Sequence, residues 1–134
     1  MKIKSTSKSN TLAKAIQTAC EIHIRTLDLA AKWIAFDPFG VVVADLEIAE
    51  SDAFCLREQL MVIDLDLDLT AIKPPRVAPV KDGKDHYATF LNHVKGIESA
   101  IRRLKALDFK LQGPVLHAIE GLSGDLEELR SQAS

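Results

Sequence analysis

The chain has 134 residues, of which 47% are hydrophobic and 27% are charged, and its formal net charge is -2. This length predicts a single domain, and the hydrophobic fraction excludes a wholly disordered chain. Only 6 Gly and 5 Pro argue against a turn-rich sandwich or barrel. No apolar run approaches the roughly 18 to 20 residues of a membrane span, and residues 1–10 lack the apolar core of a signal peptide. We therefore expect no membrane partner.

Residues 1–10 are basic, rich in Ser and without hydrophobic periodicity. A segment with so little to bury is expected to be a flexible basic tail. The rest of the chain, residues 11–134, is expected to form one helical-bundle domain.

Residues 11–36 predict the first helix, because polar side chains recur at steps of three and four. Two apolar rows flank this polar stripe, and an apolar arc of that width predicts a helix with more than one packing neighbour. The stripe consists of Lys14, Thr18, Glu21, Arg25, Asp28 and Lys32.

The Asp37-Pro38 pair predicts the start of a second helix over residues 38–66. An Asp side chain can accept hydrogen bonds from free N–H groups at a helix start, and Pro at the first position loses no bond there. Apolar residues spaced by three or four define the expected core row of this helix. They are Phe39, Val42, Leu46, Ala49, Ala53, Leu56, Leu60, Ile63 and Leu67.

Residues 63–69 also alternate strictly between aliphatic side chains and Asp, which is the period of a half-buried strand. Leu and Asp are poor strand formers, so a helix end is preferred here over a short strand. Three aspartates near a helix C-terminus oppose the macrodipole, and the helix should therefore fray or stop in this region.

Residues 73–82 form a Pro-rich linker, and a third helix follows over residues 83–111, beginning near Asp82 or Asp85. Its expected buried face is Phe90, Val94, Ile97, Ile101, Leu104 and Leu111. Gly113-Pro114 ends this helix and starts the last one, residues 114–130. The last helix should bury Val115, Ile119, Leu122, Leu126 and Leu129.

These patterns predict an all-α fold, an antiparallel four-helix bundle with helices over roughly 11–36, 38–66, 83–111 and 114–130. The tight corners make the first helix antiparallel to the second, and the third antiparallel to the fourth. The Pro-rich linker joins the second helix to the third.

No spacing in the sequence predicts a metal site, a cofactor or a catalytic residue. A di-iron bundle needs Glu-x-x-His, and the residues three positions before the four histidines are Cys20, Gly83, Phe90 and Pro114. Cys20 and Cys55 are too few for a disulfide framework and are expected to be reduced, buried thiols, which favours a cytoplasmic location. The basic group on the third helix lacks interleaved aromatic residues, so no nucleic-acid partner is expected.

The segment Asn92-His93-Val94-Lys95-Gly96 resembles the phosphoacceptor motif of histidine phosphotransfer domains, which are also four-helix bundles. In that family Lys follows His by three residues and lies one turn beyond it. Here Lys95 follows His93 by two, so the resemblance implies a phosphotransfer role only as an alternative. A small helical enzyme whose site escapes motif search is the related possibility.

The second helix carries a second apolar row, roughly opposite its core row, which recurs every seven residues. An isolated bundle needs only one buried face per helix, so this row predicts another neighbour. That neighbour is either another part of the same domain or a second protein chain. The expected function is a non-enzymatic protein–protein interaction or assembly module, self-associating or bound to another protein. The candidate interface is Val41, Ile48, Cys55, Val62 and Leu69.

Overall fold

The protein is described by a computed structural model covering residues 2–37, 39–40, 42–77, 85–107 and 113–133. In these ranges the chain forms four α-helices, one 3-10 turn and no β-strand. The helices are α1 (Lys2–Phe36), α2 (Val43–Met61), α3 (His86–Lys105) and α4 (Gly113–Ala133), and the turn is η1 (Leu69–Ala71). The predicted all-α fold is confirmed. None of the helices in these ranges is both long and apolar enough to cross a bilayer.

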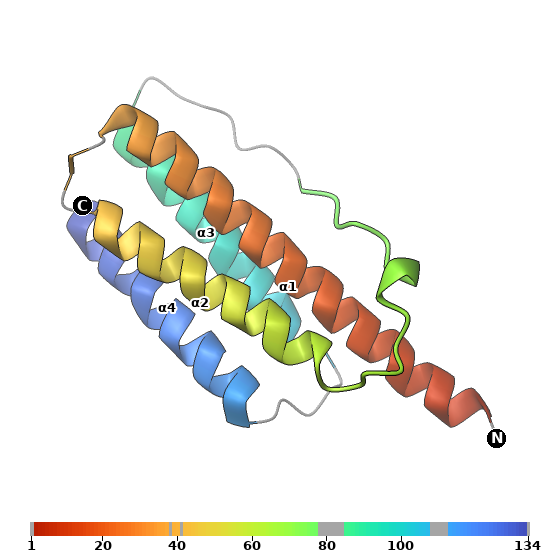
Figure 1. Cartoon of the computed structure of the whole chain (residues 1–134). Coiled ribbons are helices and arrows are strands. Elements are labelled where there is room, and N and C mark those ends of the chain that lie inside the picture. The colour runs from red at the N-terminus through yellow and green to blue at the C-terminus, as the bar shows by residue number, and fades with distance from the viewer. Residues whose placement is uncertain (1, 38, 41, 78–84, 108–112, 134) are drawn as a thin grey trace.

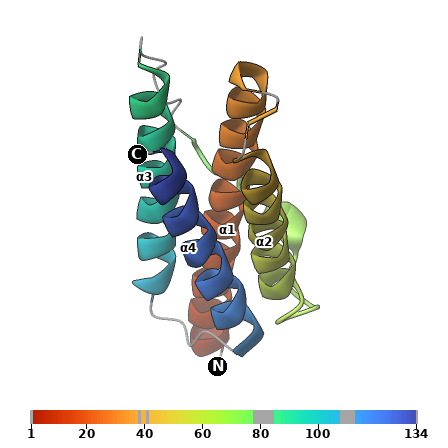
Figure 2. The same cartoon turned by 90° about the vertical axis from the view of Figure 1, so that its left-hand side faces the viewer.

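The helices form a bundle in which every helix is antiparallel to both of its neighbours. α1 packs against α2 and α3, and α4 packs against the same two helices. Figure 1 shows α1 and α4 running in one direction and α2 and α3 running in the other. The view in Figure 2 places α4 in front of α1, with α3 and α2 on either side. α2 and α3 are therefore diagonal partners that run parallel to each other.

One hydrophobic core fills the centre of the bundle, and each helix contributes a row to it. The five residues expected on the last helix are all buried, as are Phe90, Val94, Ile97, Ile101 and Leu104 on α3. Leu111, the remaining residue of that row, lies outside the described residues. On α2 the buried row runs from Val42 to Leu60, while Ile63 and Leu67 are only partly buried.

The first helix begins earlier than its periodicity predicts. α1 includes residues 2–10, which were expected to be a flexible tail and are helical here. Figure 1 shows the N-terminal turns of α1 extending past the ends of α2 and α3. At the other end the N–H group of Asp37 donates to the carbonyl oxygen of Trp33 at 2.8 Å, which completes the last turn.

The predicted start of the second helix at residue 38 is wrong, because α2 begins at Val43. Asp37 does not cap it: its carboxylate lies over Gly40, where a Cβ atom would collide with it. Val42 precedes the helix and makes no side-chain capping bond. Phe39 therefore belongs to the corner and not to the helix, and its ring is 96% exposed instead of lying in the core. Pro38 lies outside the described residues.

The predicted end of the second helix at residue 66 is also wrong, because α2 ends at Met61. Oδ1 of Asp64 accepts a hydrogen bond from the N–H group of Asp66 at 3.0 Å, and Oδ1 of Asp68 accepts one from the N–H group of Thr70 at 3.0 Å. These local bonds compete with helical hydrogen bonding and favour turns. The alternating stretch is therefore neither a strand nor a helix end.

The connection that follows lies along the outside of α1 (Figure 1). Nε2 of Gln17 donates to the carbonyl oxygen of Lys73 at 2.9 Å, and Ile72 packs against the core. Beyond residue 77 the predicted linker lies outside the described residues.

The third helix is shorter than the predicted range of residues 83–111 and consists of His86–Lys105. Asp85, one of the two expected starting points, is its N-cap. Its Oδ1 atom accepts hydrogen bonds from the N–H groups of Tyr87 and Ala88 at 3.0 and 3.2 Å. The last helix extends one residue before and a few beyond the expected residues 114–130.

A buried carboxylate on α1 forms a hydrogen-bonded ion pair with α3. Glu21 is only 6% exposed, and its carboxylate accepts hydrogen bonds from Nε of Arg25 at 2.9 Å and from Nη1 of Arg103 at 3.0 Å. Nη2 of Arg103 also donates to it, which makes the pair bidentate. The bonds from Arg103, with help from Arg25, hold the pKa of Glu21 below its ordinary value of 4.5 against the effect of burial.

Replacing Arg103 by Leu should destabilise the fold at neutral pH by about 1–3 kcal/mol, because the buried carboxylate would lose two charge-assisted bonds. A lowered pKa contributes stability above the ordinary value and loses that contribution as the pH falls. The difference between R103L and the native chain should therefore shrink between about pH 5 and pH 3. Urea unfolding at about pH 5 and at about pH 3 measures this difference in the free energy of unfolding. R102L, at the exposed neighbouring arginine, is the control. Equal losses in the two variants would contradict the role of this contact.

Candidate functional site

The structure places the predicted outer row of α2 at the surface of the chain. Ile48 is 51% exposed and Val62 is 57% exposed. Cys55 between them is exposed and Cys20 is only partly buried, so the expectation of two buried thiols is wrong. The inner row of the same helix is almost completely buried, from Leu46 to Leu60. α2 thus has one apolar side inside the bundle and a second one that no other described segment covers.

Two residues of the predicted row are not part of this exposed side of α2. Val41 lies outside the described residues. Leu69 is exposed, but it starts η1 after the chain has left α2, and it lines a small cleft beside Cys20 and Met61. The seven-residue spacing therefore keeps side chains on one face along the helix, but not after the turns at Asp64 and Asp68 begin. Ile48, Cys55 and Val62 form the part that the structure brings together, and we call them the α2 outer row.

Sequence reasoning missed the apolar surface beside this row. Phe54 is partly exposed, its ring contacts the ring of His23 edge-on at 5.7 Å, and the guanidinium of Arg57 lies 4.9 Å from its centre. On α1, Ile24 and Leu27 are also exposed. Leu27 belongs to one of the two apolar rows that flank the polar stripe of the first helix, whereas Ile24 belongs to neither.

The polar stripe of the first helix explains why that surface is apolar. Glu21 and Arg25 are engaged with α3, and Oδ2 of Asp28 lies 3.8 Å from Nδ1 of His93 on α3. The polar residues of α1 therefore lie along its border with α3. Part of its apolar arc is left to face outward on the side of α2.

Acidic residues flank the α2 outer row. Glu47 is exposed, and Glu58 pairs with the guanidinium of Arg57 at 3.1 Å. On the side of α4, Asp52 forms a carboxyl pair with Asp125. Burial is the main reason that the pKa of Asp125 rises to about 7, and the hydrogen bond with Asp52 and the charges of Asp52 and Asp45 add to it. The pair therefore shares a proton below neutral pH.

Replacing Asp125 by Asn should raise the melting temperature at pH 8 and raise it less near pH 5. A carboxyl whose folded pKa is raised binds its proton more tightly in the folded state, so stability falls as the pH rises from its ordinary value of 3.8 to about 7. The amide in D125N can still donate to Asp52 but carries no charge. Thermal unfolding followed by circular dichroism measures this, with E127Q, at an exposed carboxylate of α4, as the control. The same shift at both pH values would count against the paired proton.

The four histidines do not converge on one site. His23 and His93 are buried, whereas His86 and His117 are exposed. Burial and the positive charge of Arg57 lower the pKa of His23, so its ring is neutral near pH 7. Among the described residues, no group of three or more His, Cys, Asp or Glu side chains could hold a metal ion.

Comparison with known proteins yields no relative. No protein-family model matches the chain, and neither a curated protein nor a solved structure matches it. Functional conclusions therefore rest on the side chains of this chain alone.

Proposed function

We propose that the protein is a non-enzymatic assembly module that pairs with a second copy of itself through the α2 outer row. The observation that supports this most directly is the exposure of Ile48 and Val62, two large aliphatic side chains two helical turns on either side of Cys55. Aliphatic side chains aligned on one helix face gain free energy when a partner removes them from water, by about 25 cal/mol per Å². Phe54 beside them enlarges the area available.

A second copy is the partner that the spacing fits. Because the row repeats every seven residues, two antiparallel copies of α2 can align with Cys55 facing its counterpart at a two-fold axis. Ile48 of one copy then meets Val62 of the partner subunit, and the reverse contact is identical, as a symmetric interface requires. Ser51 and Gln59, both exposed and uncharged, lie near this line.

The acidic flanks set the salt dependence of such a dimer. In an antiparallel pair centred on Cys55, Glu58 of one copy lies on the same side as Glu47 and Glu58 of the partner subunit, so these carboxylates repel each other. Salt screens interactions between exposed charges. Association should therefore strengthen, and not weaken, as salt is added.

The phosphotransfer alternative has no support in the geometry. His93 is only 4% exposed and its Nδ1 atom lies 3.8 Å from the carboxylate of Asp28, while Lys95 is exposed on α3. No described cluster of side chains favours a different enzymatic role.

Replacing Ile48 and Val62 by Glu should convert the dimer to a folded monomer. Both side chains are exposed within one chain, so the substitutions should preserve the helical circular dichroism signal. At a covered interface each unpaired charge costs several kcal/mol, and about 1.4 kcal/mol corresponds to a tenfold change in affinity. Sedimentation should therefore give half the native mass at micromolar concentrations.

Leu116 provides the matched control, because it is a similarly exposed aliphatic residue on α4. L116E should sediment like the native chain. A native chain that sediments as a monomer, or an I48E/V62E variant that keeps the native mass, would show that a second copy does not cover this row. Co-purification of a different protein with the native chain but not with the variant would point to a heterologous partner instead.

Mild oxidation with diamide should cross-link the dimer through Cys55, since the two thiols face each other at the proposed axis. C55S should abolish the cross-linked species on a non-reducing gel, and C20S should not. Cys20 is partly buried, and burial raises the pKa of its thiol, which disfavours the reactive thiolate. Cross-linking that depends on Cys20 would contradict the antiparallel arrangement. A yield of cross-linked dimer that rises when the protein is diluted would contradict it as well.

A further inference from the structure

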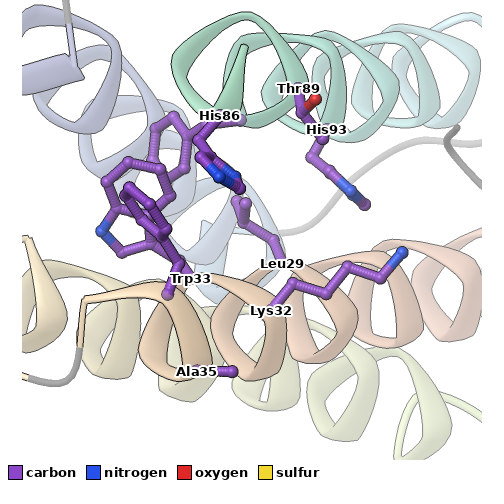
Figure 3. A pocket seen from close by; sticks show the side chains of 9 residues that line it. Leu29, Lys32, Trp33, Ala35, His86, Thr89 and His93 are labelled. Atoms are coloured by element: carbon purple, nitrogen blue, oxygen red, sulfur yellow. The ribbon is translucent and has the colours of Figure 1, made fainter. Parts of the chain in front are cut away.

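Two cavities of similar volume border α1, and they differ in how their positive groups are partnered. The cavity in Figure 3, about 350 Å³, lies between α1 and the start of α3, with the rings of Trp33 and Phe36 in its wall. At its other end Oδ2 of Asp28 lies 3.6 Å from Nζ of Lys32 and 3.8 Å from Nδ1 of His93. A carboxylate of the chain therefore already occupies the place where an anionic ligand would bind.

The second cavity, about 330 Å³, is a groove between α1, α3 and the connection that follows η1. It is lined by Gln17 and Glu21 of α1, by Lys73 and Arg76 of the connection, and by Arg103 of α3. The bond of 2.9 Å from Nε2 of Gln17 to the carbonyl oxygen of Lys73 holds the connection at this place. We call this cavity the connection groove, and its volume is within the range of small-molecule sites, about 300–1,000 Å³.

Cations outnumber carboxylates in the connection groove. Lys73, Arg76 and Arg103 line it, and Glu21 is the only carboxylate among its lining residues. Lys73 and Arg76 are exposed, and within the described part of the chain neither forms an ion pair with an acidic side chain. These two residues therefore give the groove positive charge that no described carboxylate balances.

The charge of Glu21 is already neutralised. Glu21 is only 6% exposed, and its carboxylate accepts hydrogen bonds from Arg25 and from both Nη atoms of Arg103. The side chain of Arg103, in contrast, is 52% exposed. The ion pair between α1 and α3 therefore presents a guanidinium and not a carboxylate to a ligand in the groove.

Arg103 keeps hydrogen-bond donors for such a ligand. A guanidinium has five N–H donors, and the bonds to Glu21 use two of them. Its planar fork matches the spacing of phosphate oxygens. The hydroxyl of Thr18, which also lines the groove, already donates to the carbonyl oxygen of Lys14 at 2.8 Å. The basic side chains are thus the donors that select the ligand.

We propose that the connection groove binds a small phosphate-bearing anion, with its phosphate oxygens between Arg103 and the side chains of Lys73 and Arg76. A bound anion would link the connection to α3, so it should also stabilise the fold. The inference is independent of self-association, because none of these residues belongs to the α2 outer row.

Calorimetry with inorganic pyrophosphate tests the site. Pyrophosphate should bind one to one and at least about tenfold more tightly than acetate at equal ionic strength, because several cations meet its charges. Its affinity should fall as sodium chloride is added, since salt screens exposed charges. The melting temperature should rise with pyrophosphate and not with acetate.

Two double variants locate the charges. K73Q/R76Q should weaken pyrophosphate binding at least about tenfold, because the groove loses two of its three cations. K95Q/R102Q is the matched control, since it removes the same charge at two exposed residues of α3 that do not line the groove. It should leave the affinity nearly unchanged. Circular dichroism should be native in both, because all four side chains are exposed.

A third variant tests the position of the connection without changing any charge. Q17M keeps the length of the side chain but cannot donate to the carbonyl oxygen of Lys73. It should weaken pyrophosphate binding several-fold, because Lys73 and Arg76 are then no longer held opposite Arg103.

Several outcomes would overturn the proposal. Absence of saturable pyrophosphate binding at millimolar concentration would show that the groove is not a site for this class of ligand. Equal losses in the two double variants would show that net charge alone attracts the anion, and native affinity in Q17M would show that the groove does not assemble the site. Co-sedimentation with vesicles containing phosphatidic acid, without binding of free pyrophosphate, would indicate a membrane surface instead of a small ligand.

Discussion

The direction of α3 is the constraint on which the rest of the structure depends. Because α3 runs parallel to its diagonal partner α2, the chain between them must return along the whole bundle, about 30 Å for a helix of this length. The aspartates after Met61 form hydrogen-bonded turns that follow the end of α2. Gln17 then holds the returning segment against α1 through the carbonyl oxygen of Lys73. With α3 in this direction, Arg103 bonds to Glu21 and Phe90 contacts Trp33.

The fold class and the buried rows could be predicted because apolar spacing reports directly on burial. All five expected residues of α4, from Val115 to Leu129, are in the core. The helix ends could not be predicted as well, because short polar contacts decide them. Asp37 was expected to cap α2 and instead lies over Gly40, and Asp64 and Asp68 bond to their own backbone. The periodic pattern at Phe39 therefore continued into a segment that is not helical.

Sequence spacing likewise predicted one of the candidate surfaces and not the other. The α2 outer row was visible as a seven-residue repeat, and the structure leaves Ile48, Cys55 and Val62 exposed. Leu69 obeys the same repeat, but the helix has ended before it. The connection groove had no periodic signature, because Gln17, Lys73 and Arg103 come from three segments far apart in the sequence. Only the return of the chain along α1 brings them together.

The bond between Glu21 and Arg103 joins residues 82 positions apart, whereas α1 and α2 are connected by a short corner. The α1–α2 and α3–α4 hairpins consist of contacts between consecutive helices and can form early, but their docking closes a long loop. Loop-closure entropy rises slowly with length, by about 0.6 kcal/mol for each doubling. Changes in the length of the connection should thus affect folding rate only mildly. Substitutions at the docked face, where Glu21 lies, act on the step that assembles the two halves.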